Sequence, residues 1–145
     1  FSFVWKLYYE MQMPMLLGFK KVYGDLESFH VHGICLINHA LNSKRNDNSE
    51  MSKEFYLEKY FFADKKDFSG VNAMSISEIT GIPRATVIRK LNRLLKEKFL
   101  KIDSKKHYST TGVNQKKILN VQKKTLDNLS NFVTRIYNLS LIKDN

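Results

Sequence analysis

The sequence predicts a mostly α-helical fold that contains one small β-hairpin. Apolar residues recur at spacings of three and four through most of the chain, which is the period of helices with one buried face. Only residues 99–110 alternate like two short strands around a polar turn. The 145 residues allow one ordinary domain with extra helices, and 43% hydrophobic residues supply material for a core.

Long helices are predicted at both ends of the chain. Residues 1–23 are rich in aromatic residues and Met and stop at Gly24, although Pro14 should kink or split this helix. Residues 114–141 form the second long helix. Its apolar stripe comprises Leu119, Leu126, Leu129, Val133 and Ile136, widened by Phe132 and Leu139. Because a stripe of this length usually needs a partner helix, we expect both terminal helices to support a homodimer.

Two further helices are expected before residue 70. Asp25 is a suitable N-cap for a helix over residues 26–41. The predicted buried stripe of this helix is Leu26, Phe29, Gly33, Ile37 and Ala40. A polar loop, a short aromatic helix and a second polar loop follow at residues 42–49, 53–62 and 63–70. Residues 1–70 are therefore interpreted as a helical region that supports dimerisation and the core.

Two short helices joined by a tight turn are predicted next. Asn72 is a suitable cap for a helix that ends at Thr80, with Ile76 and Ile79 facing inward. Gly81 supplies the left-handed backbone conformation that a tight turn needs. The chain should therefore reverse sharply between the two helices.

The second of these helices leads directly into the hairpin. Pro83 suits its first turn, and the helix is expected over residues 84–97. Its inner positions are Val87, Leu91 and Leu94, and its outer positions are Arg89, Lys90, Arg93 and Lys96. Two strands at 99–102 and 107–110 are joined by a turn at 103–106.

Residues 71–112 resemble the winged helix-turn-helix of bacterial transcription regulators. The resemblance rests on Ile76, Thr80-Gly81-Ile82-Pro83, Thr86-Val87, Arg89, Leu91, Leu94, Phe99-Leu100 and the Lys105-Lys106 hairpin. With long helices on both sides, the pattern is most similar to MarR-type proteins, and the IclR-type DNA-binding domain is the second choice. Residues 113–145 then form a C-terminal dimerisation helix. Lys98 stands where such families usually have Gly, so either a Lys there adopts a costlier backbone conformation or the turn differs.

The resemblance implies a sequence-specific DNA-binding regulator that acts as a homodimer. Helix 84–97 would enter the major groove of double-stranded DNA, and the wing at 103–106 would contact the backbone or the minor groove. The net charge of +10 and the pI of about 9.7 independently favour a polyanionic partner. The candidate DNA-binding residues are Arg84, Ala85, Thr86, Ile88, Arg89, Lys90, Arg93, Lys105, Lys106 and His107.

Two alternatives remain open. The fold could serve as a protein–protein interaction module. It could also be an effector or metal sensor, because His32, Cys35 and His39 share one helical face and could present two nitrogens and a sulfur. A small apolar effector could bind among the aromatic residues of 1–23 and 55–62.

Several classes of function are not expected. No nucleotide-binding glycine loop, paired-carboxylate site or nucleophile signature is present, so we expect neither catalysis nor a bound cofactor. The single cysteine excludes a disulfide framework. No apolar run approaches the ~20 residues that span a bilayer, and the start of the sequence lacks the features of a signal peptide. A cytoplasmic protein without a membrane partner is therefore expected.

Overall fold

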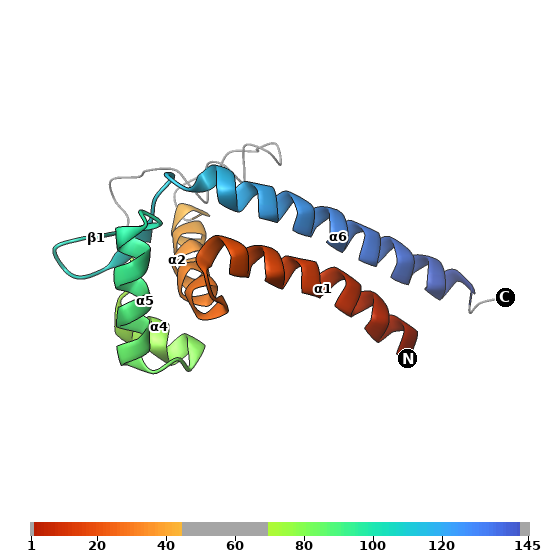
Figure 1. Cartoon of the computed structure of the whole chain (residues 1–145), viewed down its shortest axis with the longest axis horizontal. Coiled ribbons are helices and arrows are strands. Elements are labelled where there is room, and N and C mark those ends of the chain that lie inside the picture. The colour runs from red at the N-terminus through yellow and green to blue at the C-terminus, as the bar shows by residue number, and fades with distance from the viewer. Residues whose placement is uncertain (1, 45–69, 143–145) are drawn as a thin grey trace. The chain divides into compact units, whose positions relative to one another are not determined.

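The computed structural model describes residues 2–44 and 70–142, with side chains described outside 40–44. Its elements are α1 (Ser2–Tyr23), α2 (Leu26–Lys44), α4 (Ala73–Thr80), α5 (Arg84–Lys96), β1 (Leu100–Ile102), β2 (Tyr108–Thr110) and α6 (Gln115–Ile142) (Figure 1). The mostly helical class with a small antiparallel hairpin is confirmed. The short helix predicted at 53–62 and the second polar loop lie outside the described residues.

The chain forms two compact units. One combines the two chain ends, Phe1–Asp25 and Lys116–Asn145, and the other is Leu26–Gln115. Each of the predicted segments, 1–70, 71–112 and 113–145, is one continuous stretch of the chain. The first compact unit, by contrast, combines the long first helix with the long last helix.

Within the first unit, α1 and α6 run antiparallel, side by side (Figure 1). The Nη1 of Arg135 donates a hydrogen bond of 2.9 Å to Oε2 of Glu10. Farther along α1, Gly18 lies opposite Val121, where a Cβ on residue 18 would lie 2.9 Å from Cγ1 of Val121. The helices therefore meet both through an ion pair and through a close approach that a glycine permits.

Both helices of this unit keep large apolar side chains at the surface. The exposed ones on α1 are Phe3, Val4, Trp5, Tyr9, Met13 and Leu17. The exposed ones on α6 are Leu126, Leu129, Val133, Tyr137, Leu141 and Ile142. Of the predicted α6 stripe, Leu126, Leu129 and Val133 are thus exposed in the single chain, and the other residues are half-buried. Pro14 lies inside α1, which continues to Tyr23, so the helix is not split there.

The second unit packs α2, α4, α5 and the hairpin around one core. Its buried apolar residues include Val31, Cys35, Leu36, Ile76, Val87, Leu91, Leu94, Phe99, Leu100 and Tyr108. The predicted inward position of Ile76 is confirmed, but the prediction for Ile79 is wrong, since this side chain is 63% exposed. Ile79 lies at the edge of α4 and lines a groove with Phe29 and Ile37 of α2.

The buried face of α2 also differs from the prediction. Ser28, Val31, His32, Cys35 and His39 are buried, whereas Ile37 of the predicted stripe is 55% exposed. The observed residues follow spacings of three and four, so the helical period was correct and the choice of face was wrong. The helix also extends to Lys44, beyond the predicted end at residue 41.

Candidate nucleic-acid interface

Caps on both sides fix the turn between α4 and α5. At the start of α4, Oδ1 of Asn72 accepts a hydrogen bond of 2.9 Å from the N–H of Ser75. At its end, Gly81 has a φ of 70°, and its N–H donates to the carbonyl of Ser77 over 2.9 Å. The Ser77 hydroxyl also donates to the carbonyl of Ile82. The predicted cap and left-handed turn are confirmed, and they orient α5 against α4.

Helix α5 has one fully buried face and one exposed face. Val87, Leu91 and Leu94 are completely buried and hold the helix on the core. The exposed residues of the outer face are Arg84, Ala85, Ile88, Arg89, Asn92 and Lys96. Their spacing of three to four makes them a continuous surface along the helix, with Thr86 half-buried beside it. Seven of the ten predicted contact residues lie on α5, and five of those seven lie on or beside this surface.

Lys90 and Arg93 do not belong to the outer face. The Nζ of Lys90 lies 3.0 Å from Oε2 of Glu27 on α2, and the Lys90 side chain is only 12% exposed. The Nη2 of Arg93 donates a hydrogen bond to Oγ of the buried Ser28 over 2.6 Å. The prediction that both side chains stay outside is therefore wrong. They lie at the side of α5 that packs against α2 and bind that helix.

The amino end of α5 has no side-chain cap. Pro83 occupies the N-cap position and makes no side-chain hydrogen bond to the first turn. The first N–H groups of a helix have no partner within the helix, and together with the helix dipole they favour an anion. Arg84 and Ala85 are exposed at this end. The end of α5 therefore offers backbone donors together with an exposed arginine in its first turn.

The hairpin after α5 forms where the alternation predicted it. β1 and β2 pair antiparallel, with Leu100 opposite Thr110 and Ile102 opposite Tyr108. Val71, which precedes α4, also pairs with Tyr108 through two backbone hydrogen bonds of 3.0 and 2.8 Å. These bonds attach the hairpin to the segment that leads into α4.

A single carboxylate shapes the tip of the hairpin. Oδ1 of Asp103 accepts hydrogen bonds from the backbone N–H of Lys105 (2.9 Å) and of His107 (2.8 Å). The bond from the His107 N–H is the main cause that holds the pKa of Asp103 below its usual value. Lys105 and Lys106 project exposed from this turn, and Lys106 adopts a φ of 61°. The predicted basic tip is thus held by Asp103.

Lys98 links α5 to the hairpin in the costlier backbone conformation, one of the two outcomes that the sequence left open. Its φ is 61°, in the left-handed region that favours glycine. The adjacent carbonyls are satisfied, because Nδ2 of Asn114 donates to Glu97 O over 2.8 Å and the Thr111 hydroxyl donates to Lys98 O. These bonds keep a lysine in a backbone conformation that it would otherwise avoid.

The charge along α5 and the hairpin is strongly one-sided. The exposed basic residues are Arg84, Arg89, Lys96, Lys98, Lys101, Lys105 and Lys106. The acidic residues of the same stretch are engaged, Glu97 with Arg93 at 3.6 Å and Asp103 with His107 at 3.4 Å. Asn92 and Lys96 were missed as candidates, although the period that selects Arg89 also selects them.

The residues of the candidate metal face, His32, Cys35 and His39, are buried among other groups of the protein in the structure. His32 and Cys35 are almost completely buried, and the His32 ring packs edge-on against Phe99 at 5.6 Å. Thr110 Oγ1 lies 3.3 Å from Nδ1 of His39. Among residues 2–44 and 70–142, no group of three His, Cys, Asp or Glu side chains could hold a metal ion. Burial also raises the pKa of the Cys35 thiol to about 12, which disfavours the reactive thiolate.

None of the described helices combines the length and hydropathy that crossing a membrane requires. Comparison with protein-family models, with curated proteins and with solved structures found no match to the chain.

Proposed function

We propose that the chain binds double-stranded DNA as a winged helix-turn-helix regulator of MarR-like type. The observation that carries the proposal is the exposed outer face of α5, with Arg84, Arg89 and Asn92 on one continuous surface. A helix presented in this way fits the major groove, where its amino-terminal half reaches the base edges. The fully buried Val87, Leu91 and Leu94 would keep that face in a fixed orientation.

Each exposed residue of this face suits a distinct contact. Arg84 and Arg89 can bind guanine with two hydrogen bonds, and Asn92 can bind adenine in the same manner. Ile88 is apolar in a basic surrounding and suits a thymine methyl group. The small Ala85 permits close approach to the groove. Lys90 and Arg93 are left out of the proposed contacts, because they bind Glu27 and Ser28.

The hairpin tip would supply contacts that do not depend on sequence. Lys105 and Lys106 are exposed at the turn held by Asp103, next to the half-buried His107. Cations at such a position neutralise phosphates and release counterions, so they strengthen binding to any duplex. The uncapped first turn of α5 can bind a further phosphate through its N–H groups.

The proposed regulator acts as a homodimer on a two-fold related site. The support is the set of exposed apolar side chains on α1 and α6, which a second copy would bury. Two copies would place their α5 helices in successive major grooves, about one helical turn apart. Regulation of transcription would locate this activity in the cytoplasm.

Selection of bound sequences from a random duplex pool tests the proposal. We expect a palindromic motif, and Arg84→Ala or Arg89→Ala should relax the preference at one position in each half. Lys105→Ala with Lys106→Ala should instead weaken binding to all duplexes and reduce the salt slope by about 1 for each phosphate that is no longer neutralised. Binding that salt does not alter, or a pool that yields no motif, would contradict the proposal.

A groove between α2 and α4 favours a second candidate, a protein-interaction module. Phe29, Ile37 and Ile79 line it, and its volume is about 390 Å³. Apolar surface of this kind is typical of protein contacts. If this is the function, Ile79→Asp should abolish a partner contact while Arg89→Asp leaves it intact; the DNA proposal predicts the reverse for duplex binding.

A further inference from the structure

One end of the unit formed by α1 and α6 is strongly basic. The two helices are antiparallel, so the last turns of α1 adjoin the first turns of α6 (Figure 1). Residues 14–25 and 116–128 contain two acidic residues, Asp25 and Asp127, and the exposed lysines Lys20, Lys21, Lys116, Lys117, Lys123 and Lys124. Within the described part of the chain, none of these lysines forms an ion pair. We call these six lysines the basic end.

Charge is balanced at the opposite end of the same two helices. There the carboxylate of Glu10 lies 3.7 Å from the ammonium of Lys6 and 2.9 Å from the guanidinium of Arg135. The first turn of α6, by contrast, contains Lys116 and Lys117 and no acidic residue. Cations are unfavourable at the amino end of a helix, because the helix dipole is positive there. The lysines of the basic end therefore repel one another in the free protein, and a bound anion would relieve that repulsion.

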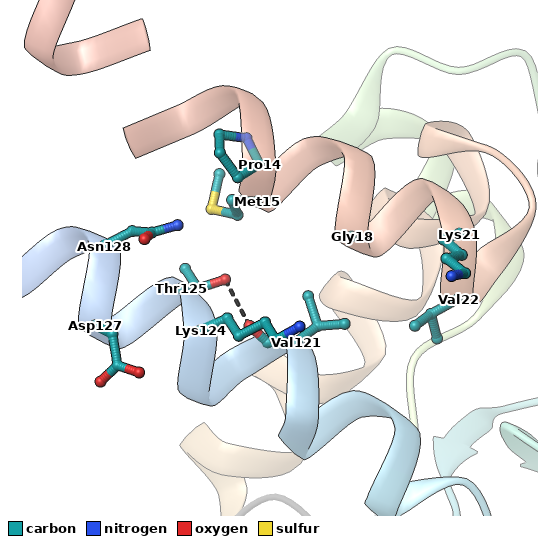
Figure 2. Close-up of a pocket in the computed structure, with 10 residues that line it drawn as sticks. All are labelled: Pro14, Met15, Gly18, Lys21, Val22, Val121, Lys124, Thr125, Asp127 and Asn128. Atoms are coloured by element: carbon teal, nitrogen blue, oxygen red, sulfur yellow. Dashed lines mark hydrogen bonds between the residues drawn. The ribbon is translucent and has the colours of Figure 1, made fainter. Parts of the chain in front are cut away.

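The spacing of these lysines suits an extended anion. Lys117 and Lys124 are seven residues apart on α6, so they lie on one face, about 10 Å apart along the helix axis. Lys116 and Lys123 repeat this spacing on the adjacent face. Lys21 of α1 lines the same interhelical pocket as Lys124, and Figure 2 shows the two side chains, one from each helix. A small anion cannot contact lysines two turns apart, whereas the backbone of duplex DNA presents phosphates over that length.

Two features favour DNA over an anionic membrane as the partner. A membrane surface binds helices whose cations flank a face of exposed apolar side chains. Within residues 14–25 and 116–125, Leu17 is the only large apolar side chain that is exposed. In addition, both connections to the unit that contains α5 leave from the basic end, where Asp25 precedes Leu26 and Gln115 precedes Lys116. The basic end is therefore covalently adjacent to the unit that carries the proposed DNA surface.

We propose that the basic end binds the phosphate backbone of double-stranded DNA without regard to base sequence. This second surface rests on the proposed function, since its ligand is the same duplex DNA, but it belongs to the other compact unit. Lys21, Lys117 and Lys124 neutralise phosphates from one side of the helix pair, and the counterions released from the DNA drive the binding. Discrimination between bases stays with the outer face of α5.

Fluorescence anisotropy of a long random-sequence duplex, titrated with the full chain at several salt concentrations, tests this surface. Lys21→Gln with Lys124→Gln should reduce the salt slope by about 1 for each phosphate that is no longer neutralised. If each lysine neutralises one phosphate, the parent chain should lose about tenfold more affinity than the variant between about 50 and 200 mM salt. The base preference on a selected duplex should stay unchanged.

The opposite end of the helix pair provides the matched control. Lys6→Gln with Arg135→Gln also removes one cation from each helix, but at positions where both cations pair with Glu10. We expect this variant to keep the salt slope of the parent chain. An equal reduction by both double variants would show an effect of net charge, and would overturn the proposal.

The results distinguish the basic end from the α5 surface. A selected motif together with an unchanged salt slope in the Lys21 and Lys124 variant would overturn the basic end and retain the α5 surface. A lower slope in that variant without any selected motif would support the basic end and contradict base recognition by α5. A parent chain that binds no duplex would overturn both. If that variant lost binding to phosphatidylserine vesicles but not to DNA, the lysines would serve a membrane and the proposal would be wrong.

Discussion

Lys98 adopts a backbone conformation that is unfavourable for a residue other than glycine. With a φ of 61°, it occupies the left-handed region, which costs a non-glycine residue roughly 1 kcal/mol. Lys98→Gly should therefore stabilise the protein by about 0.5 kcal/mol, after allowance for the greater freedom of glycine in the unfolded chain. Urea unfolding of the variant and the parent chain measures this difference.

Lys96 provides the contrasting position for that experiment. It is exposed in the last turn of α5 and has helical conformation, so Lys96→Gly should cost about 0.5–1 kcal/mol. Opposite signs at two lysines separated by one residue would identify backbone conformation as the cause. If Lys98→Gly destabilised the chain as much as Lys96→Gly, residue 98 would not be strained.

His32 should make the stability of the fold sensitive to acid. Burial lowers the pKa of His32 from 6.5 to about 4, although a hydrogen bond with the Phe99 backbone opposes the shift. The unfolded chain therefore binds the proton first, and stability should fall as the pH decreases from about 6.5 to about 4. The loss from this group is about 3 kcal/mol at most. Urea unfolding at several pH values between 7.5 and 4.5 measures it.

Substitution of His32 isolates its share of that acid sensitivity. His32→Gln should lower stability at pH 7.5, yet flatten the dependence on pH below 6.5. His30→Gln, at an exposed position of the same helix, should leave the dependence unchanged. An equally steep pH dependence in His32→Gln would assign the effect to other groups.

At the level of elements, the predictions from sequence were most accurate for features that depend on bonds between neighbouring residues. The cap at Asn72, the turn at Gly81 and the hairpin around Asp103 each depend on bonds within a few residues. Such bonds are local, so a reading of the sequence without tertiary information can find them. These features position the outer face of α5, and most of the candidate site was accessible in this way.

The buried face of α2 could not be found by the same reasoning. Apolarity favours the side with Phe29 and Ile37, but the structure buries Ser28, His32 and His39. Ser28 accepts a hydrogen bond from Arg93, and His39 lies beside Thr110, at sequence separations of 65 and 71 residues. Polar groups can be buried when such distant partners satisfy them, and no local pattern reveals the partners. Lys90 and Arg93 were misplaced for the same reason.

Two adjacent residues of α5 should differ in role: Arg89 in DNA contact and Lys90 in packing against α2. Arg89→Ala removes an exposed side chain, so it should leave stability within about 0.5 kcal/mol and cost about 1–3 kcal/mol in discrimination at one base pair. Lys90→Ala removes the ion pair with Glu27 and should cost about 0.5–1 kcal/mol of stability, since that carboxylate is half exposed. Urea unfolding and titration of a selected duplex measure the two effects. Loss of discrimination in Lys90→Ala at unchanged stability would place Lys90 at the DNA.

At the scale of the whole molecule, the pair of α1 and α6 leaves large apolar side chains exposed on both helices. Four exposed apolar residues recur every four positions on α1: Trp5, Tyr9, Met13 and Leu17. The opposite side of α1 carries Leu7, which is buried, and Gly18, which lies against Val121 of α6. Isolated exposed apolar residues are ordinary, but a contiguous stripe on each of two helices supports the proposed interface. A second copy is the occupant that we propose for it, in keeping with the proposed two-fold site.

Substitutions on α6 should test that dimer directly. Leu129 and Val133 are 41% and 56% exposed and lie one turn apart, so Leu129→Glu with Val133→Glu would place two carboxylates in the interface. Carboxylates buried there without partners should raise the dimer dissociation constant at least tenfold. The matched control is Thr134→Glu with Asn138→Glu, which adds the same charge with the same spacing at exposed polar positions outside that stripe. Size-exclusion chromatography with light scattering at micromolar concentration should show a dimer for the parent chain and the control, and a monomer for the first variant.

A parent chain that remains monomeric would contradict the homodimer. Equal dissociation of both variants would attribute the dissociation to the added charge rather than to the loss of the apolar stripe.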